Sequence, residues 1–209
     1  MKVIGIVGGM GAGKSTVVAL LNEIEPVSSI SADLIGHEIL RKGEPAYAPI
    51  LEAFGHDILD ESGEIIRKKL GQAVFGDEEK VRRLNEITHP LIMKRVIEKI
   101  QASKRAMPHR HIILEAALLL ESGLVDLTDL VIAVYADPNI RIKRVIQREG
   151  LSEVQIIKRF KAQKEWEELK AAADYVIDNS VSLEETKKQI RYILQEIDCT
   201  CQRGKEEKR

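Results

Sequence analysis

A glycine-rich stretch directly after a short apolar run constrains this chain more than any other feature. The apolar run is Val3–Val7, and residues 8–16 then read Gly-Gly-Met-Gly-Ala-Gly-Lys-Ser-Thr. Apolar residues recur at helical spacing between residues 17 and 24 and predict a helix there. The stretch therefore fits G-x-x-x-x-G-K-[ST] in the order that a phosphate-binding loop (P-loop) needs, which is strand, loop and helix.

The residue types in this loop suit the binding of phosphate groups. Glycine permits positive φ angles and lets backbone N–H groups approach phosphate oxygens closely. Lys14 offers a cation to the β- and γ-phosphates, and Ser15 offers a hydroxyl to Mg²⁺. We expect the chain to bind a nucleoside triphosphate, with Mg²⁺ as the cofactor, through Gly8, Gly11, Ala12, Gly13, Lys14, Ser15 and Thr16.

The composition argues against several other classes of protein. With 32 basic and 33 acidic residues the formal net charge is −1, so we expect neither nucleic acid nor a membrane surface as a partner. No apolar run has the length of a bilayer span, and the first residues lack a signal-peptide pattern. Cys199 and Cys201 lie in a charged tail that we expect to fray, with reduced thiols. We expect a cytoplasmic protein that is a monomer or a small homo-oligomer.

Five short apolar runs alternate with helical patterns along the chain. Such alternation predicts an α/β fold in which helices cover both faces of a parallel sheet. The expected strands are residues 3–7, 27–30, 111–115, 130–135 and 175–177.

The segment between the second and third expected strands shows helical patterns throughout and is too long for a simple crossover. We therefore expect an inserted helical cap over the site. Its last helix, from Glu78 to Ile100, should be interrupted at His89-Pro90, because proline lacks a backbone N–H.

Two carboxylates stand where expected strands end, which is where ligands bind in parallel sheets. Asp33 follows the second strand and can accept or orient the proton of an acceptor hydroxyl. The alternative for Asp33 is the N-cap of the next helix. Glu115 ends the third strand and is either an outer partner of Mg²⁺ or a carboxylate without that role.

A basic stripe follows the fourth expected strand. Arg141, Arg144 and Arg148 are three and four residues apart and share one helical face. Further polar residues follow on the next helix, namely Arg159, Lys161 and Gln163. The stripe is either a lid that clamps phosphate groups or a solvated basic face.

Several further motifs occur in a fixed order after the P-loop: Ala32–His37, His89–Ile92, Leu118–Glu121, Arg144 with Arg148, Arg159 with Gln163, and Ala173–Asn179. Together with the P-loop they resemble the dephospho-coenzyme A kinase family, from residue 1 to about residue 197. The resemblance implies transfer of the γ-phosphate of ATP to the ribose 3′-hydroxyl of dephospho-coenzyme A, with Mg²⁺.

The resemblance also implies an architecture and a set of site residues. The fold would be a nucleotide-kinase-like, five-stranded parallel sheet flanked by helices, formed by residues 1–35 and 106–197, with a lid at about 145–170, a substrate-binding insertion over 36–105 and a tail over 198–209. Asp33 would face the 3′-hydroxyl, with Lys14 and Arg144 also in catalytic roles. Arg148 would bind ATP, whereas Asp33, His89 and Glu115 would bind the acceptor.

The chain departs from the family pattern at two places. Ser31 stands where the family usually has aspartate, and Ala117 stands where many members have proline. Two alternatives remain at this point. A nucleoside or nucleotide monophosphate kinase would share the core. A GTP-dependent switch protein would explain the D-x-x-G patterns at Asp33 and Asp60, but the chain lacks Asn-Lys-x-Asp.

Overall fold

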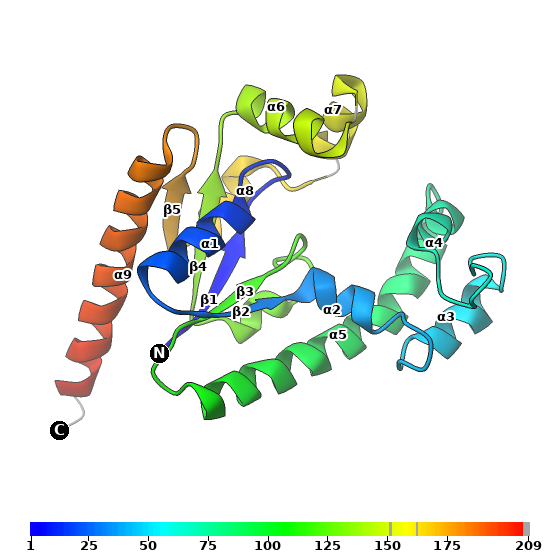
Figure 1. Cartoon of the computed structure of the whole chain (residues 1–209), viewed down its shortest axis with the longest axis horizontal. Helices are drawn as coiled ribbons and strands as arrows, with labels where there is room; N and C mark the ends of the chain where they lie inside the picture. Colours follow the sequence, from blue (N-terminus) through cyan, green and yellow to red (C-terminus); the bar gives the residue numbers. More distant parts are fainter. Residues whose placement is uncertain (151, 162, 207–209) are drawn as a thin grey trace. The chain divides into compact units, whose positions relative to one another are not determined.

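The computed structural model describes residues 1–150, 152–161 and 163–206 (Figure 1). The chain forms two compact units. The first combines Met1–Ser29 with Met107–Arg209, and the second is Ile30–Ala106.

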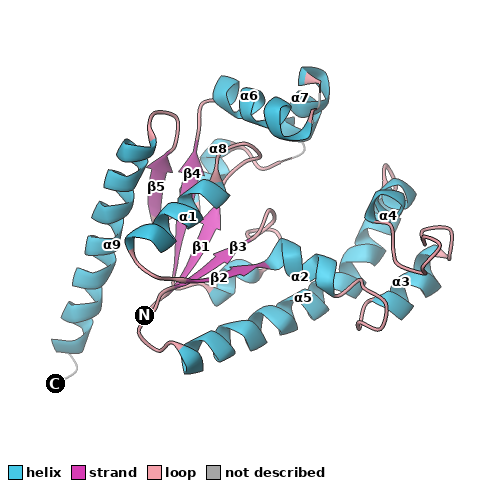
Figure 2. Cartoon of the chain, viewed as in Figure 1, coloured by secondary structure: helices cyan, strands magenta, loops and turns pink. Residues whose placement is uncertain are grey.

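The first unit is built on a parallel sheet whose strands lie in the order β2-β3-β1-β4-β5 (Figure 2). The central strand β1 is buried along its whole length and pairs in parallel with β3 and β4. The predicted five-stranded parallel sheet is confirmed, with β2 one residue later than expected. The strands are β1 (Val3–Val7), β2 (Ser28–Ser31), β3 (Ile112–Glu115), β4 (Leu130–Tyr135) and β5 (Tyr175–Asp178).

Helices cover both faces of this sheet. On one face, side chains of α1 and α9 pack with the strands around Ile4, Ile6 and Ile132 in one apolar core. On the other face, Trp166 of α8 packs against Tyr135 of β4 with ring centroids 4.8 Å apart and ring planes tilted by 53°. The helices are α1 (Lys14–Ile24), α6 (Pro138–Glu149), α7 (Glu153–Lys161), α8 (Trp166–Ala171) and α9 (Leu183–Glu206), with a 3₁₀ turn η1 (Leu124–Leu127).

The last helix corrects one expectation. Helix α9 begins after Ser182, whose hydroxyl accepts a hydrogen bond from the Glu185 N–H as a cap. It continues to Glu206, so residues 198–206 of the tail that we expected to fray are helical. The preceding part of α9 is already helical and packs on the core through Ile193 and Ile197, so the tail only has to extend an existing helix. Cys199 is an exposed free thiol on α9.

The second unit consists mainly of helices packed on one long helix. Helices α2 (Ala32–Glu38), α3 (Tyr47–Phe54) and α4 (Arg67–Val74) all contact α5 (Glu78–Ala106). Two ion pairs also join α5 to other parts of this unit: Arg95 pairs with Glu44 at 3.1 Å, and Lys99 pairs with Glu38 at 3.6 Å.

Helix α5 is continuous, so the predicted interruption at His89-Pro90 is wrong. Pro90 lies inside the 29-residue helix. A proline there removes one backbone donor and strains one turn. Helices α2, α3 and α4 pack against α5, and tertiary packing of this kind stabilises a helix against an unfavourable local residue.

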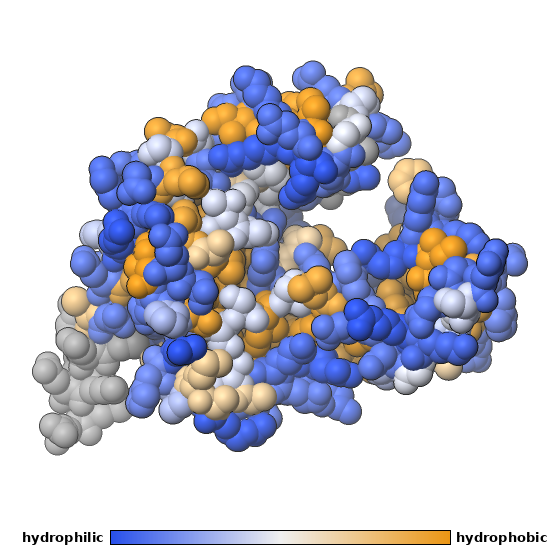
Figure 3. All heavy atoms as spheres, viewed as in Figure 1, coloured by the Kyte–Doolittle hydropathy of each residue, from blue (hydrophilic) through white to orange (hydrophobic). Residues whose placement is uncertain are grey.

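Polar side chains cover most of the surface visible in Figure 3. The two longest helices, α5 and α9, carry charged residues throughout. Over residues 1–150, 152–161 and 163–206, none of the helices combines the length and the apolar character needed to cross a bilayer.

Replacing Pro90 should show the cost of proline in α5. We expect Pro90→Ala to raise the free energy of unfolding by about 1–2 kcal/mol, which is the interior penalty of proline less the entropy that alanine returns to the unfolded chain. The control is Pro138→Ala. Pro138 stands at the first turn of α6, where proline is well tolerated, so this change should bring no gain. Urea denaturation monitored by circular dichroism measures both. A lower stability for Pro90→Ala would contradict our account of α5.

Candidate active site

The glycine-rich loop joins β1 to α1 and adopts backbone conformations that favour glycine. Gly11 and Gly13 have φ angles of 78° and 92°. A Cβ on Gly13 would clash with the side-chain amide of Asn179, and one on Gly11 would lie 2.7 Å from the Arg141 carbonyl oxygen. Glycine is therefore required at both positions for conformation and for space.

The loop and the end of β3 bring polar side chains together. The parallel register pairs Glu115 of β3 with Ile6 of β1, which places Glu115 beside the loop. The Ser15 hydroxyl donates to Glu115 Oε1 at 3.3 Å, and Lys14 Nζ donates to the Gly8 carbonyl at 2.8 Å. The hydroxyl and the carboxylate are oxygen donors of the kind that Mg²⁺ prefers, so these two residues fit a magnesium site.

A buried asparagine, Asn179, fixes the backbone of the loop by a hydrogen bond. Asn179 follows β5, and its Nδ2 donates to the Ala12 carbonyl at 2.9 Å. Its Oδ1 accepts a hydrogen bond from the Thr186 hydroxyl of α9 at 3.2 Å. Both side chains are almost fully buried. Sequence reasoning named Asn179 only within a motif, although its place at the carboxyl end of a strand is a signal for a site residue.

The three arginines of the basic stripe have different surroundings. Arg144 reaches the loop region, because its Nη2 donates to the Asn179 carbonyl at 2.9 Å and its Nη1 lies 3.4 Å from the Ala12 carbonyl oxygen. Arg148 is exposed and forms an ion pair with Glu149. Arg141 is half-buried and contacts Met10 of the loop, which the sequence did not predict.

The second unit carries Asp33 in the first turn of α2. The N-cap of this helix is Ser31, whose hydroxyl accepts from the Leu34 N–H at 3.3 Å, so the alternative that Asp33 caps the helix is wrong. Serine and aspartate are comparable caps, so Ser31 fills the N-cap position at the place where the family usually has aspartate. One turn later, burial lowers the pKa of His37, with a smaller contribution from the charge of Arg67, while Asp33 opposes both.

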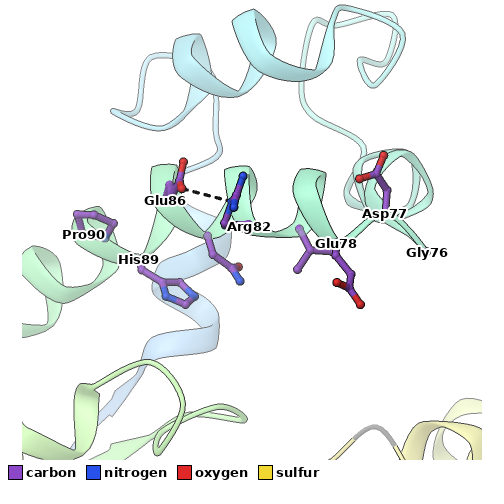
Figure 4. A pocket seen from close by; sticks show the side chains of 9 residues that line it. Gly76, Asp77, Glu78, Arg82, Glu86, His89 and Pro90 are labelled. Atoms are coloured by element: carbon purple, nitrogen blue, oxygen red, sulfur yellow. Dashed lines mark ion pairs between the residues drawn. The ribbon is translucent and has the colours of Figure 1, made fainter.

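His89 lines an open pocket of about 720 Å³ in the second unit. Figure 4 shows side chains of this pocket on successive turns of α5, with Arg82 and Glu86 joined as an ion pair at 3.8 Å. The volume is in the range of sites for small organic ligands. The pocket is lined by Gly76, Asp77, Glu78, Val81, Arg82, Asn85, Glu86, His89 and Pro90.

A P-loop between β1 and α1 of a five-stranded parallel sheet defines the class of P-loop nucleoside-triphosphate-binding proteins. The fold is also that of a shikimate kinase from Bacteroides thetaiotaomicron, with a TM-score of 0.53 over 94% of this chain and 98% of that one, at 13% identity. At this identity the likeness concerns the fold alone.

Sequence comparison identifies the family. The family described as "Dephospho-CoA kinase" matches residues 2–185. A dephospho-CoA kinase from Aquifex aeolicus is 45% identical over 197 residues, covering 94% of this chain and 98% of the relative. The structure of a dephospho-CoA kinase from Campylobacter jejuni has a TM-score of 0.69 at 30% identity, with coverage of 93% and 96%. The chain belongs to the dephospho-CoA kinase family and is an enzyme. Neither a nucleoside or nucleotide monophosphate kinase nor a GTP-dependent switch protein is favoured by these comparisons.

Thr186 offers a test of the support behind the loop. We expect Thr186→Val to lower the free energy of unfolding by about 1–3 kcal/mol, because the buried Asn179 Oδ1 loses its donor. The affinity for ATP should fall by up to about tenfold, since Asn179 then holds Ala12 less firmly. The control is Thr88→Val, which removes a hydroxyl bonded to Leu84 in α5 of the second unit. Calorimetric ATP titrations in which both variants bind ATP alike would argue against a role of Asn179 at the loop.

Proposed function

We propose that this enzyme transfers the γ-phosphoryl group of ATP to the ribose 3′-hydroxyl of dephospho-coenzyme A, giving coenzyme A and ADP. The observation that carries the proposal is the family match over residues 2–185, which includes the complete P-loop. In the reaction a bond forms between the 3′-oxygen and the γ-phosphorus. The bond from that phosphorus to the β–γ bridging oxygen breaks, and ADP leaves.

The P-loop binds the triphosphate in this proposal. Gly8, Gly11, Ala12 and Gly13 supply backbone around the phosphates, and Lys14 supplies a cation for the β- and γ-phosphate oxygens. Ser15 would hold Mg²⁺ through its hydroxyl. Glu115 would be an outer partner of the ion, since its Oε1 lies 3.3 Å from the Ser15 hydroxyl oxygen. When bound, the ion neutralises charge on the phosphate oxygens. Thr16 continues the loop into α1. Arg144 and Arg148 would reach ATP from the side of the lid, which we place at about residues 145–170.

The second unit serves the acceptor in this proposal. Asp33 accepts the proton of the 3′-hydroxyl or orients that hydroxyl for in-line attack. The helical insertion over residues 36–105 binds the remainder of dephospho-coenzyme A. His89 supports this assignment, because it lines the pocket on α5.

The choice of acceptor is the direct test of the proposal. With ATP and Mg²⁺, release of ADP should be at least about 100-fold faster with dephospho-coenzyme A than with AMP or adenosine, and EDTA should abolish it. Lys14→Ala should cost several orders of magnitude in rate, because a cation aimed at the transferred group is lost. A coupled ADP assay measures all of these rates. Equal turnover with AMP would contradict the proposal that dephospho-coenzyme A is the preferred acceptor.

Asp33 is tested by a substitution that keeps its size. We expect Asp33→Asn to lower turnover about 100-fold or more while ATP binding and the melting temperature stay near wild type, because asparagine cannot take up the proton. The effect is smaller if positioning outweighs proton transfer in this reaction. The control is Ser31→Ala, which removes the helix cap and should lower stability by about 1 kcal/mol with little loss of turnover. Wild-type turnover in Asp33→Asn would exclude Asp33 as the base.

A further inference from the structure

Both backbone groups of Met10, in the middle of the P-loop, are held by side chains from distant parts of the chain. The Met10 N–H donates to Gln163 Oε1 at 2.9 Å, across 153 residues of sequence. The Met10 carbonyl accepts from Arg141 Nε at 2.9 Å, across 131 residues. The donor and the acceptor of one loop residue are thus both fixed by the region that follows β4.

Arg141 is itself held in place. Its guanidinium carbon lies 4.1 Å from the centre of the Phe160 ring of α7, a cation–π contact. It also lies close to Gly9, where an added Cβ would clash with Nη2. Burial lowers the pKa of Arg141, but a guanidinium starts so high that it keeps its charge at neutral pH.

Among the residues that the structure describes, no carboxylate forms an ion pair with Arg141. Arg148 and Arg159 both pair with Glu149, whereas Arg141 takes part in none of the ion pairs found among the described residues. Its contacts are a carbonyl oxygen and an aromatic ring. A half-buried cation with neutral partners adds a positive potential beside the loop, where the phosphates of ATP would lie.

We propose that Arg141, Phe160 and Gln163 (the Met10 clip) are positioning residues for nucleotide binding. The clip fixes the peptide groups on both sides of Met10, so the loop is ordered before phosphate arrives and less ordering entropy is lost on binding. Phe160 and Gln163 act through Arg141 and Met10, while Arg141 adds its charge. The inference rests on the proposed function only in taking ATP as the ligand.

The test measures ATP binding directly, by calorimetry without any acceptor, and then the KM values for both substrates. We expect Gln163→Ala and Arg141→Lys each to raise the Kd and KM for ATP about tenfold, with the KM for dephospho-coenzyme A within twofold of wild type. Lysine keeps the charge of Arg141 but loses the planar donor and the stacking. The matched control is Gln155→Ala, because Gln155 lies on α7 near Gln163 in the sequence but bonds to Ser152 rather than to the loop.

A double variant completes the experiment. Gln163→Ala with Phe160→Leu should raise the Kd by less than the product of the two single effects, because both substitutions loosen the same residue. The proposed role of the Met10 clip is contradicted if the Kd for ATP stays within twofold of wild type in Gln163→Ala and Arg141→Lys, whether or not the melting temperature falls. Because no acceptor is needed for the Kd, this outcome is distinct from a failure of the proposed reaction.

Discussion

The backbone conformation of the P-loop at Ala12 and Gly13 is the constraint on which the rest of the site depends. Gly13 adopts a left-handed conformation as the N-cap of α1, and the Ala12 carbonyl accepts the hydrogen bond from Asn179. A side chain at residue 13 would occupy the space of that amide. With this geometry fixed, α1 starts at Lys14, and its first N–H groups stand at the loop, where an anion is favoured.

The three arginines near the loop differ in their present partners, which an arginine would have to leave in order to bind a phosphate group. Arg141 and Arg144 donate to carbonyl oxygens, so their positive charge persists at the loop. Arg148 instead pairs with Glu149 on the surface. An exposed pair of this kind is worth about 1 kcal/mol or less, so moving Arg148 to a phosphate group costs little. The structure thus combines fixed positive charges at the loop with a positive charge on the surface of α6, Arg148, that is easily redirected.

Much of the fold could be predicted because its signals are local. Short apolar runs predicted the strands, and the strand–loop–helix order predicted the place of the glycine-rich loop between β1 and α1. The errors fell where packing opposes local propensity. Pro90 predicted a break, but the helices packed on α5 keep it continuous. Asp33 was a plausible cap for a helix starting at Leu34, but α2 already starts at Ala32, so Ser31 occupies the N-cap position.

The sequence by itself determined the P-loop, the parallel α/β sheet and the family, because each is encoded in residues close together or in ordered motifs. The roles of Asp33, His89 and Arg148 stay predictions on that basis. Only the tertiary structure decided what holds the loop. Asn179 with Thr186, and Arg141 with Gln163, reach Ala12 and Met10 across more than a hundred residues. No local periodicity records such contacts, since they arise only when parallel strands bring their carboxyl ends to one edge of the sheet.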